Sequence, residues 1–512
     1  MLACGKKASA DGSTMVARNC DSNSTEAQRI ISYPRMKHQL PQMIRIPDSN
    51  NVSVPQVEET YAFTAITRMI DGDDIGMVAG GVNEWQLSVG ASTGGWLKKE
   101  VEDVSPIPES VVGDYRMQLI LERCKTAREA IKWLGDNVAE YGARTDNYII
   151  ADPEEVWFYE EYQAHHWAAV RVPDDCFVVE GNSFRIGIID PNDTENCACD
   201  PDLIPFAIKH GWYDPKDGPF YAARTYGTAD RNRPRGPKVD EYHNPYYSLH
   251  RIWRAISLLS DLELDPYEPT KEYPLFVKPS HPLKPEDMIN VLKDWYEGTE
   301  LDEYTPQFEN DNTTLVDPFT GRYKYSPIWC KSRVIGCQQT ITSWVTQCRS
   351  WLPNGIGAVI WAGLTAAATS PHLPFYACNL TTPQAYQIGD SGDDSQYIEG
   401  SAYWLYENIG NIMNLFYQGT VDLVKPVWAD FDRKSYEAQE GIEKIALEFY
   451  KQDPQKCAEF LTNYSCGVAN NALDLGKKML GDLFLRLAMV NNPQTSRGYE
   501  DPKSWQGAGT VY

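Results

Sequence analysis

The sequence predicts an α+β fold built on a largely antiparallel sheet. Short apolar runs separated by Asp, Pro and Gly turns recur over residues 1–180, a pattern typical of antiparallel strands. Longer segments with apolar residues at helical spacing follow in blocks and do not alternate strictly with the strands. Blocks of strands and blocks of helices indicate a layered α+β fold rather than a parallel α/β fold.

The chain begins with a predicted hairpin. Residues 1–4 are apolar, Asp11 and Gly12 form a turn signal, and residues 13–18 are the expected returning strand. A second strand pair is predicted over 61–69 and 75–78, joined by a turn at 71–73. A tight loop is predicted at 80–85, followed by a strand over 86–91.

The rest of the chain separates into further blocks. Residues 147–180 predict four short strands (147–151, 156–160, 166–172 and 176–180), and strands return at 333–339 and 358–363. Helical spacing covers 111–141, 203–210, 247–259, 285–296 and most of 402–490. Without a linker of low complexity, we expect one large domain over 1–512. Its core is 1–400 with a loop insertion at about 214–244, and 401–512 is mainly helical.

Composition excludes several classes of partner. The formal net charge is −24, whereas nucleic acids and anionic membrane surfaces require basic patches. No apolar run reaches the ~20 residues that span a bilayer. The 12 cysteines lack a paired framework, so we expect a reducing, cytoplasmic compartment. Sequons at Asn51, Asn192 and Asn312 leave export open, and a homo-oligomer also stays open.

Metal and cofactor motifs are incomplete. His165 with His166, and Cys197 with Cys199, each supply half of a metal site, and no further pair at the usual spacing completes either. The phosphate-binding and dinucleotide-binding glycine patterns are missing, as is the nucleophile elbow of serine hydrolases. We therefore predict chemistry without a metal or a cofactor.

Three short stretches carry side chains suited to amide hydrolysis. Arg18 and Asp21 follow the first hairpin; an arginine lowers a nearby thiol pKa, and a carboxylate can orient an amine. Asn83, in the 80–84 glycine loop, and Asn182, after Gly181, carry amides that can stabilise an oxyanion. Taken singly, each stretch also fits an ordinary turn or a solvated loop.

Taken together, these stretches resemble peptidase family C69, the dipeptidase A type of cysteine peptidase. The resemblance extends in order over most of the chain. The matching segments are GKKASADGSTMVARN at 5–19, GGVNE at 80–84, IADPEEVW at 150–157, HWAAVRVPDD at 166–175, YEGT at 296–299, RSWLP at 349–353 and SAYW at 401–404.

The resemblance implies the four-layer αββα sandwich of N-terminal nucleophile hydrolases. In such enzymes the thiol of an N-terminal cysteine attacks the amide carbonyl and its own α-amine serves as the base. Arg18 and Asp21 match the pair beside the nucleophile, Asn83 the oxyanion-hole amide, and Asn182 a second active-site asparagine. A later arginine, Arg333 or Arg349, is also implied. Dipeptides or short peptides are the implied substrates.

The position of the nucleophile leaves two readings open. Family members place cysteine first, then a Thr-Thr-like pair, then the apolar strand before Gly-Lys-Lys, whereas Cys4 directly precedes Gly5. Either residues 1–3 are removed and Cys4 becomes the nucleophile, or the nucleophile lies upstream of Met1. An acylase for other small amides and a non-enzymatic, secernin-like protein are the alternative functions.

Overall fold

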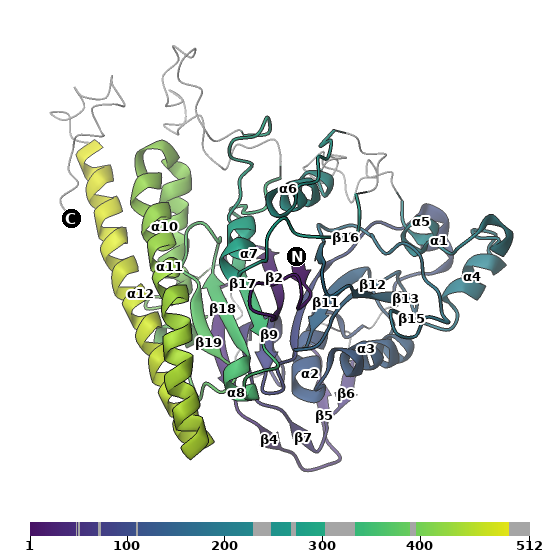
Figure 1. The fold of residues 1–512 in the computed structure, drawn as a ribbon, viewed down its shortest axis with the longest axis horizontal. Coiled ribbons are helices and arrows are strands. Elements are labelled where there is room, and N and C mark those ends of the chain that lie inside the picture. The colour runs from purple at the N-terminus through teal and green to yellow at the C-terminus, as the bar shows by residue number, and fades with distance from the viewer. Residues whose placement is uncertain are drawn as a thin grey trace.

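The computed structural model describes residues 1–490 except 48, 50–51, 70–72, 109–110, 229–246, 268–272, 303–332 and 390–395. Two antiparallel sheets dominate this part of the chain (Figure 1). The first has the order β16-β14-β1-β2-β17-β18-β19. Its strands are β1 (Leu2–Cys4), β2 (Thr14–Asp21), β14 (Phe177–Val179), β16 (Phe276–Val277), β17 (Thr340–Cys348), β18 (Val359–Leu364) and β19 (Leu373–Tyr376).

The second sheet has the order β15-β13-β12-β11-β10-β9-β8-β3. Its strands are β3 (Arg29–Tyr33), β8 (Phe63–Arg68), β9 (Met77–Asn83), β10 (Ser88–Thr93), β11 (Asp146–Ala151), β12 (Val156–Glu161), β13 (Trp167–Val172) and β15 (Cys197–Cys199). Two small ribbons complete the strands: β4 (Met36–Lys37) with β7 (Glu59–Thr60), and β5 (Met43–Arg45) with β6 (Ser53–Pro55).

Helices lie outside the two sheets. They are α1 (Lys99–Val104), α2 (Arg116–Arg123), α3 (Ala127–Tyr141), α4 (Leu203–Lys209), α5 (Ala222–Tyr226), α6 (Leu249–Leu259), α7 (Pro285–Leu292), α8 (Asn354–Gly357), α9 (Gln384–Gln387), α10 (Ala402–Leu415), α11 (Tyr417–Gln452) and α12 (Pro454–Val490). The last three stand side by side at one edge of the molecule (Figure 1). They confirm the helical character predicted for 402–490.

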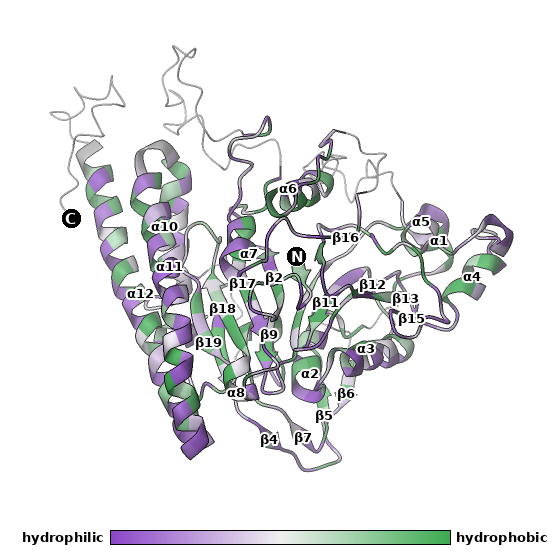
Figure 2. Ribbon diagram, viewed as in Figure 1, coloured by the Kyte–Doolittle hydropathy of each residue, from purple (hydrophilic) through white to green (hydrophobic). Residues whose placement is uncertain are grey.

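Alternation along the strands produces the layers. In β1, Ala3 points into the cluster between the two sheets, while Leu2 and Cys4 point to the helices on the other face. That outer cluster includes side chains of α6, α7, α11 and α12. A further cluster joins α2 and α3 to the outer face of the second sheet. Apolar residues gather on the central strands (Figure 2). The expected α+β fold and αββα layering are confirmed.

The 80–84 segment corrects one expectation. Residues 80–83 belong to strand β9, not to a tight loop. A Cβ atom on Gly80 would lie 2.0 Å from the Trp344 ring, and one on Gly81 would lie 2.8 Å from the Ala65 side chain. Gly80 therefore allows the two sheets to approach each other, and Gly81 leaves room for the neighbouring strand β8; neither glycine is there to turn the chain.

The predicted helix over 111–141 is in fact interrupted. Helix α2 ends at Arg123, and Cys124 has extended backbone angles. Thr126 then caps α3, because its side chain accepts a hydrogen bond from the Glu129 backbone N–H. Gly142, with φ of 75°, follows the end of α3. The apolar spacing typical of a helix therefore continues across the break between α2 and α3, which is why the sequence predicted a single helix.

Two further boundaries differ from the predictions. The strand expected over 333–339 lies instead at Thr340–Cys348, where the chain pairs with β2. The long loop expected over 214–244 contains α5 in its described part. Residues 229–244 of that loop lie outside the described residues, as do residues 71 and 72 of the predicted turn.

Candidate functional site

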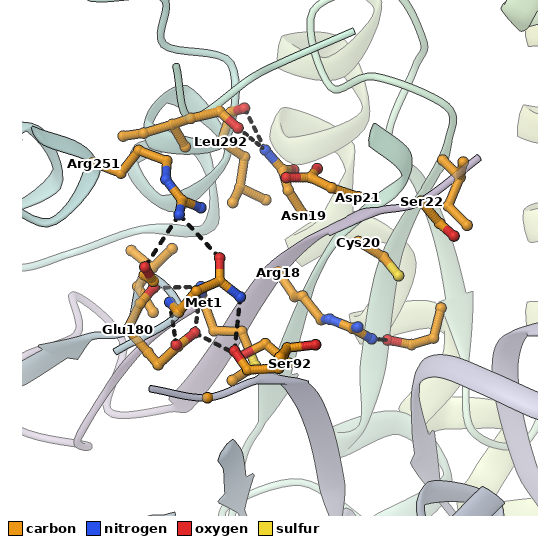
Figure 3. Close-up of a pocket in the computed structure, with 18 of the residues that line it drawn as sticks. Met1, Arg18, Asn19, Cys20, Asp21, Ser22, Ser92, Glu180, Arg251 and Leu292 are labelled. Atoms are coloured by element: carbon orange, nitrogen blue, oxygen red, sulfur yellow. Dashed lines mark hydrogen bonds and ion pairs between the residues drawn. The ribbon is translucent and has the colours of Figure 1, made fainter. Parts of the chain in front are cut away.

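A cavity of about 340 Å³ opens at the N-terminal end of β1 (Figure 3). Both sheets and α6 contribute to its wall. The polar residues that line it include Arg18, Asn19, Cys20, Asp21, Ser22, Glu26, Arg68, Ser92, Thr93, Asp114, Glu180, Asn182, Tyr247, Arg251 and Arg333. Figure 3 shows Arg251, Glu180 and Ser92 around Met1 on one side of the cavity, and Cys20 and Ser22 on the other.

Strand register places the start of β1 at this cavity. Leu2 pairs with Ala17, and Cys4 pairs with Met15, so the chain runs away from the cavity as it passes from Met1 to Cys4. The α-amine of Met1 donates a hydrogen bond to the Glu180 backbone oxygen at 2.8 Å. Burial lowers the pKa of this amine, and the nearby Glu180 carboxylate opposes that effect.

Arg18 lies beneath the cavity with its side chain buried. Its Nη1 donates to the Ala79 backbone oxygen on β9, across the sheet interface. Its buried Nε has no hydrogen-bond acceptor among the described residues. Burial raises the pKa of the neighbouring Cys20 thiol, and the Arg18 charge acts in the opposite direction. Arg18 therefore supplies positive potential to the cavity floor.

Asp21 is held by Arg333 and Thr340. Its Oδ2 lies 2.9 Å from Arg333 Nη2, and its Oδ1 accepts a hydrogen bond of 2.6 Å from the Thr340 hydroxyl. Burial by itself would raise the Asp21 pKa, but the Arg333 charge and these hydrogen bonds hold the pKa below its usual value. Asp21 is therefore a fixed carboxylate at the wall of the cavity.

Asn182 lies at the opposite wall in a left-handed backbone conformation, with φ of 62°. Its Nδ2 donates to the Thr93 backbone oxygen at 2.7 Å, and its Oδ1 accepts from Arg251 Nη2 at 2.9 Å. Its backbone N–H donates to the Glu180 carboxylate. These bonds fix the amide in one orientation and leave one of the two Nδ2 hydrogens for another acceptor.

Sequence reasoning missed Glu180, Ser92 and Arg251. The Glu180 side chain is 1% exposed and accepts hydrogen bonds from Ser92 Oγ at 2.7 Å and Asn147 Nδ2 at 3.2 Å. An acidic residue directly after the apolar run of β14 was the signal that could have revealed it. Arg251 gave no such signal, because one arginine within a helical pattern is common.

Asn83 is not part of the cavity. Its side chain is fully buried, and Nδ2 donates to the backbone oxygens of Leu121 at 2.9 Å and Cys124 at 2.8 Å. Its Oδ1 accepts from the backbone N–H groups of Trp85 and Leu87. All the hydrogen-bonding capacity of this amide is used to join β9, its following turn and α2. The expected oxyanion donor therefore holds local structure in this geometry.

Cys4 is also outside the cavity. Its side chain is fully buried against the helices that cover the first sheet, and burial raises the pKa of its thiol. Of the two later arginines, Arg333 reaches the cavity and Arg349 does not. Arg349 pairs instead with Glu443 at 2.7 Å and donates to the backbone oxygens of Ile356 and Gly357.

The described residues contain no group of three or more His, Cys, Asp or Glu side chains arranged to hold a metal ion. The half-sites at 165–166 and 197–199 thus gain no third ligand from that part of the chain. Within the same residues, no helix is long and apolar enough to cross a membrane.

Comparison with known proteins relates the chain to one family of peptidases. The family model of peptidase family C69 matches residues 1–430. A probable dipeptidase of Latilactobacillus sakei is 27% identical over 434 residues, covering 83% of this chain and 84% of that protein. A probable dipeptidase of Salmonella dublin is 28% identical over 390 residues, covering 75% and 81%. A variant of conjugated bile acid hydrolase from Clostridium perfringens is 14% identical, with a TM-score of 0.30 over 71% of this chain and 88% of that one.

Proposed function

Because the chain belongs to peptidase family C69, we propose that it hydrolyses the peptide bond of dipeptides and short peptides with a cysteine thiol as nucleophile. One observation carries the proposal: Arg18, Asp21 and Asn182, predicted from separate parts of the sequence, line the same cavity at the N-terminal end of β1. The relatives named as probable dipeptidases favour peptides over other amides as substrates.

The nucleophile belongs at the cavity end of β1. An N-terminal cysteine must bring both its thiol and its α-amine to the substrate carbonyl. Cys4 lies three residues along the strand from Met1, about 10 Å at ~3.3 Å per residue, and it faces the helical layer. If the β1–β2 pairing continues upstream of Met1, the preceding residues lie opposite Asn19, Cys20 and then Asp21. Of the two readings, this favours a cysteine ahead of Met1 over Cys4.

The chemistry then follows from the residues around that position. The α-amine takes the thiol proton, and sulfur attacks the carbonyl carbon to give a tetrahedral oxyanion. In this proposal the Nδ2 hydrogen of Asn182 that is not bonded to Thr93 stabilises that oxyanion. The ammonium returns the proton to the leaving amine, which departs and leaves a thioester. Water, deprotonated by the same amine, hydrolyses the thioester and releases the thiol.

Intact mass of the protein from its natural source tests the position of the nucleophile. A chain that begins with a cysteine upstream of Met1 supports the proposal, and a chain that begins at Cys4 supports the other reading. That natural form is then assayed on a panel of dipeptides and, alongside, on N-acyl amino acids and bile-salt amides. Hydrolysis of dipeptides that iodoacetamide abolishes is the expected result.

Asn182→Gly and Asp21→Asn variants, shown to be folded by circular dichroism, complete the assay. Each should lower kcat, because Asn182→Gly removes an amide and Asp21→Asn removes a negative charge at the cavity. The proposal is rejected if the natural form hydrolyses no dipeptide with or without a reductant. Faster hydrolysis of acyl amides than of any dipeptide would assign the protein to the acylases instead.

A further inference from the structure

Arg251 brings to the cavity a positive charge that no acidic side chain of the described residues neutralises. It lies in the first turn of α6, half-buried, and Figure 3 shows it directed toward Glu180 and Met1. Its Nε donates to the Tyr247 backbone oxygen at 3.0 Å. Its Nη2 donates to the Gly181 backbone oxygen at 3.1 Å and to Asn182 Oδ1 at 2.9 Å.

The remaining nitrogen of Arg251, Nη1, is available to bind a ligand. Within the described part of the chain, Nη1 donates no hydrogen bond and the guanidinium has no carboxylate at ion-pair distance. The Tyr247 ring, whose centroid is 4.4 Å from Cζ, lies against one face of the guanidinium and leaves its edge for an acceptor. The guanidinium is thus held in place with both N–H groups of Nη1 available, and a carboxylate oxygen can accept a charge-assisted hydrogen bond from them.

The other arginines of the cavity differ from Arg251. Arg333 is paired with Asp21, and Arg68 lies 3.8 Å from Glu26. Arg18 has no carboxylate partner among the described residues, but the residue is only 8% exposed and its side chain donates to the Ala79 backbone oxygen. Arg251 is therefore the cavity arginine best placed to meet a charged group of a substrate.

We propose that Arg251 binds the C-terminal carboxylate of the substrate and so directs cleavage to the peptide bond before the C-terminal residue. This inference rests on the proposed function. The scissile carbonyl oxygen lies at Asn182 in that proposal, and Asn182 is bonded directly to Arg251. In a dipeptide, only the nitrogen and Cα of the leaving residue separate the scissile carbon from the carboxylate carbon, a span below about 4 Å. A substrate held at Asn182 therefore presents its carboxylate beside Arg251.

Cleavage at an inner bond of a longer peptide lacks this match, and so does a neutral amide. A tripeptide cleaved at its first bond carries its carboxylate one residue further away, about 3.5 Å in an extended chain. A C-terminal carboxamide has no negative charge, so the guanidinium loses its ionic partner. Arg251 should therefore favour a free carboxylate on the residue directly after the scissile bond.

The test pairs a change in the protein with a change in the substrate. Hydrolysis of Ala-Ala, of its C-terminal amide and of Ala-Ala-Ala is measured with the wild-type protein, in its natural form, and with Arg251→Gln and Arg251→Lys. Lys209→Gln, at an exposed position on α4, is the control for loss of one positive charge. Circular dichroism and thermal melting establish that each variant is folded.

Loss of a charge-assisted hydrogen bond predicts a KM for Ala-Ala that is about 10- to 100-fold higher in Arg251→Gln, with kcat changed less. Arg251→Lys should recover part of this loss, while the amide should be hydrolysed equally by all variants. An equal fall in kcat for the dipeptide and its amide would instead make Arg251 a positioning residue for Asn182 and overturn the inference. Unchanged KM for Ala-Ala in Arg251→Gln would also overturn it, and a wild-type protein inactive on every substrate would reject the proposed function itself.

Discussion

Asp21 and Arg333 form an ion pair of 2.9 Å although 312 positions separate them in the sequence. Asp21 ends β2, and Arg333 precedes β17, the strand that pairs with β2. The ion pair therefore joins the ends of two neighbouring strands at the wall of the cavity. It fixes the carboxylate that the proposed mechanism places beside the nucleophile.

Replacing Arg333 with Gln should destabilise the protein by about 2 kcal/mol at pH 7, because Asp21 would remain largely buried without its charged partner. The wild-type Asp21 pKa is lowered in the folded state, so its stabilisation is present above the unfolded pKa of about 4 and is lost as pH falls below it. Urea unfolding of both proteins from pH 3 to pH 7 should therefore give curves that converge toward acid.

Arg433→Gln is the control for that experiment, because Arg433 forms exposed ion pairs with Asp430 and Glu437 on α11. Exposed pairs contribute little, so this variant should lose less than about 1 kcal/mol at any of these pH values. Equal losses of unfolding free energy in the two variants would show that the Asp21–Arg333 pair stabilises the fold no more than an exposed ion pair does.

Two substitutions of Asn182 should distinguish the contribution of its backbone conformation to stability from the contribution of its side-chain amide to catalysis. Asn182→Gly keeps the left-handed backbone accessible, so it should stay folded and lose about 100- to 1,000-fold in kcat if the amide stabilises the oxyanion. Asn182→Ala should lose the same activity and also about 1 kcal/mol of stability from backbone strain. The check is kcat together with urea unfolding; wild-type kcat in the glycine variant would remove Asn182 from the reaction.

Asn83→Ala should affect stability rather than chemistry. The substitution leaves two backbone carbonyls and two backbone N–H groups without their side-chain partners inside the core, at a cost of about 2–4 kcal/mol. Activity per folded molecule should remain close to wild type when folded protein is quantified by size exclusion and circular dichroism. A stable variant with a 100-fold lower kcat would return Asn83 to the oxyanion hole.

Cys4→Ala should retain hydrolysis. The Cys4 thiol is fully buried, faces the helical layer and has a raised pKa, so it is a poor nucleophile in the folded protein. Loss of its sulfur should cost about 1 kcal/mol through a small cavity. Mass spectrometry after iodoacetamide treatment of the native protein should find Cys4 unmodified. An inactive, folded Cys4→Ala variant would instead restore Cys4 as the nucleophile.

Ser343, His372 and Asp432 form a hydrogen-bonded chain that has the composition of a serine-hydrolase triad. The Ser343 hydroxyl lies 3.0 Å from His372 Nε2, and His372 Nδ1 lies 3.1 Å from Asp432 Oδ2. Ser343 and His372 are both fully buried, so no substrate reaches them. Ser343→Ala should retain hydrolysis, and a sulfonyl fluoride should leave the wild-type protein active; inhibition with labelling of Ser343 would contradict this.

Local patterns determined much of the framework. Apolar alternation and turn residues predicted the β1–β2 hairpin, β10 to β14 and the C-terminal helices, because strand and helix periods are properties of neighbouring residues. The same patterns placed Arg18 and Asp21 at the end of a strand, and Asn182 just after one. Such positions commonly carry site residues, and all three line the cavity.

Local patterns failed where a distant contact decides the role of a residue. Gly80 has the composition of a loop residue, yet Trp344 on the facing sheet requires it to be a glycine within a strand. Asn83 matches a site motif, yet α2 takes up its amide. Neither partner is near in sequence.

The sequence by itself determined the α+β class, most of the elements and three of the residues that line the cavity. Only the tertiary structure decided that Arg333 rather than Arg349 reaches Asp21, that Cys4 faces away from the cavity, and that Arg251 stands beside Asn182. The physical reason is the distance along the chain over which each kind of interaction acts. Backbone period and turn chemistry act over a few residues, whereas ion pairs and burial depend on which strands and helices meet in space.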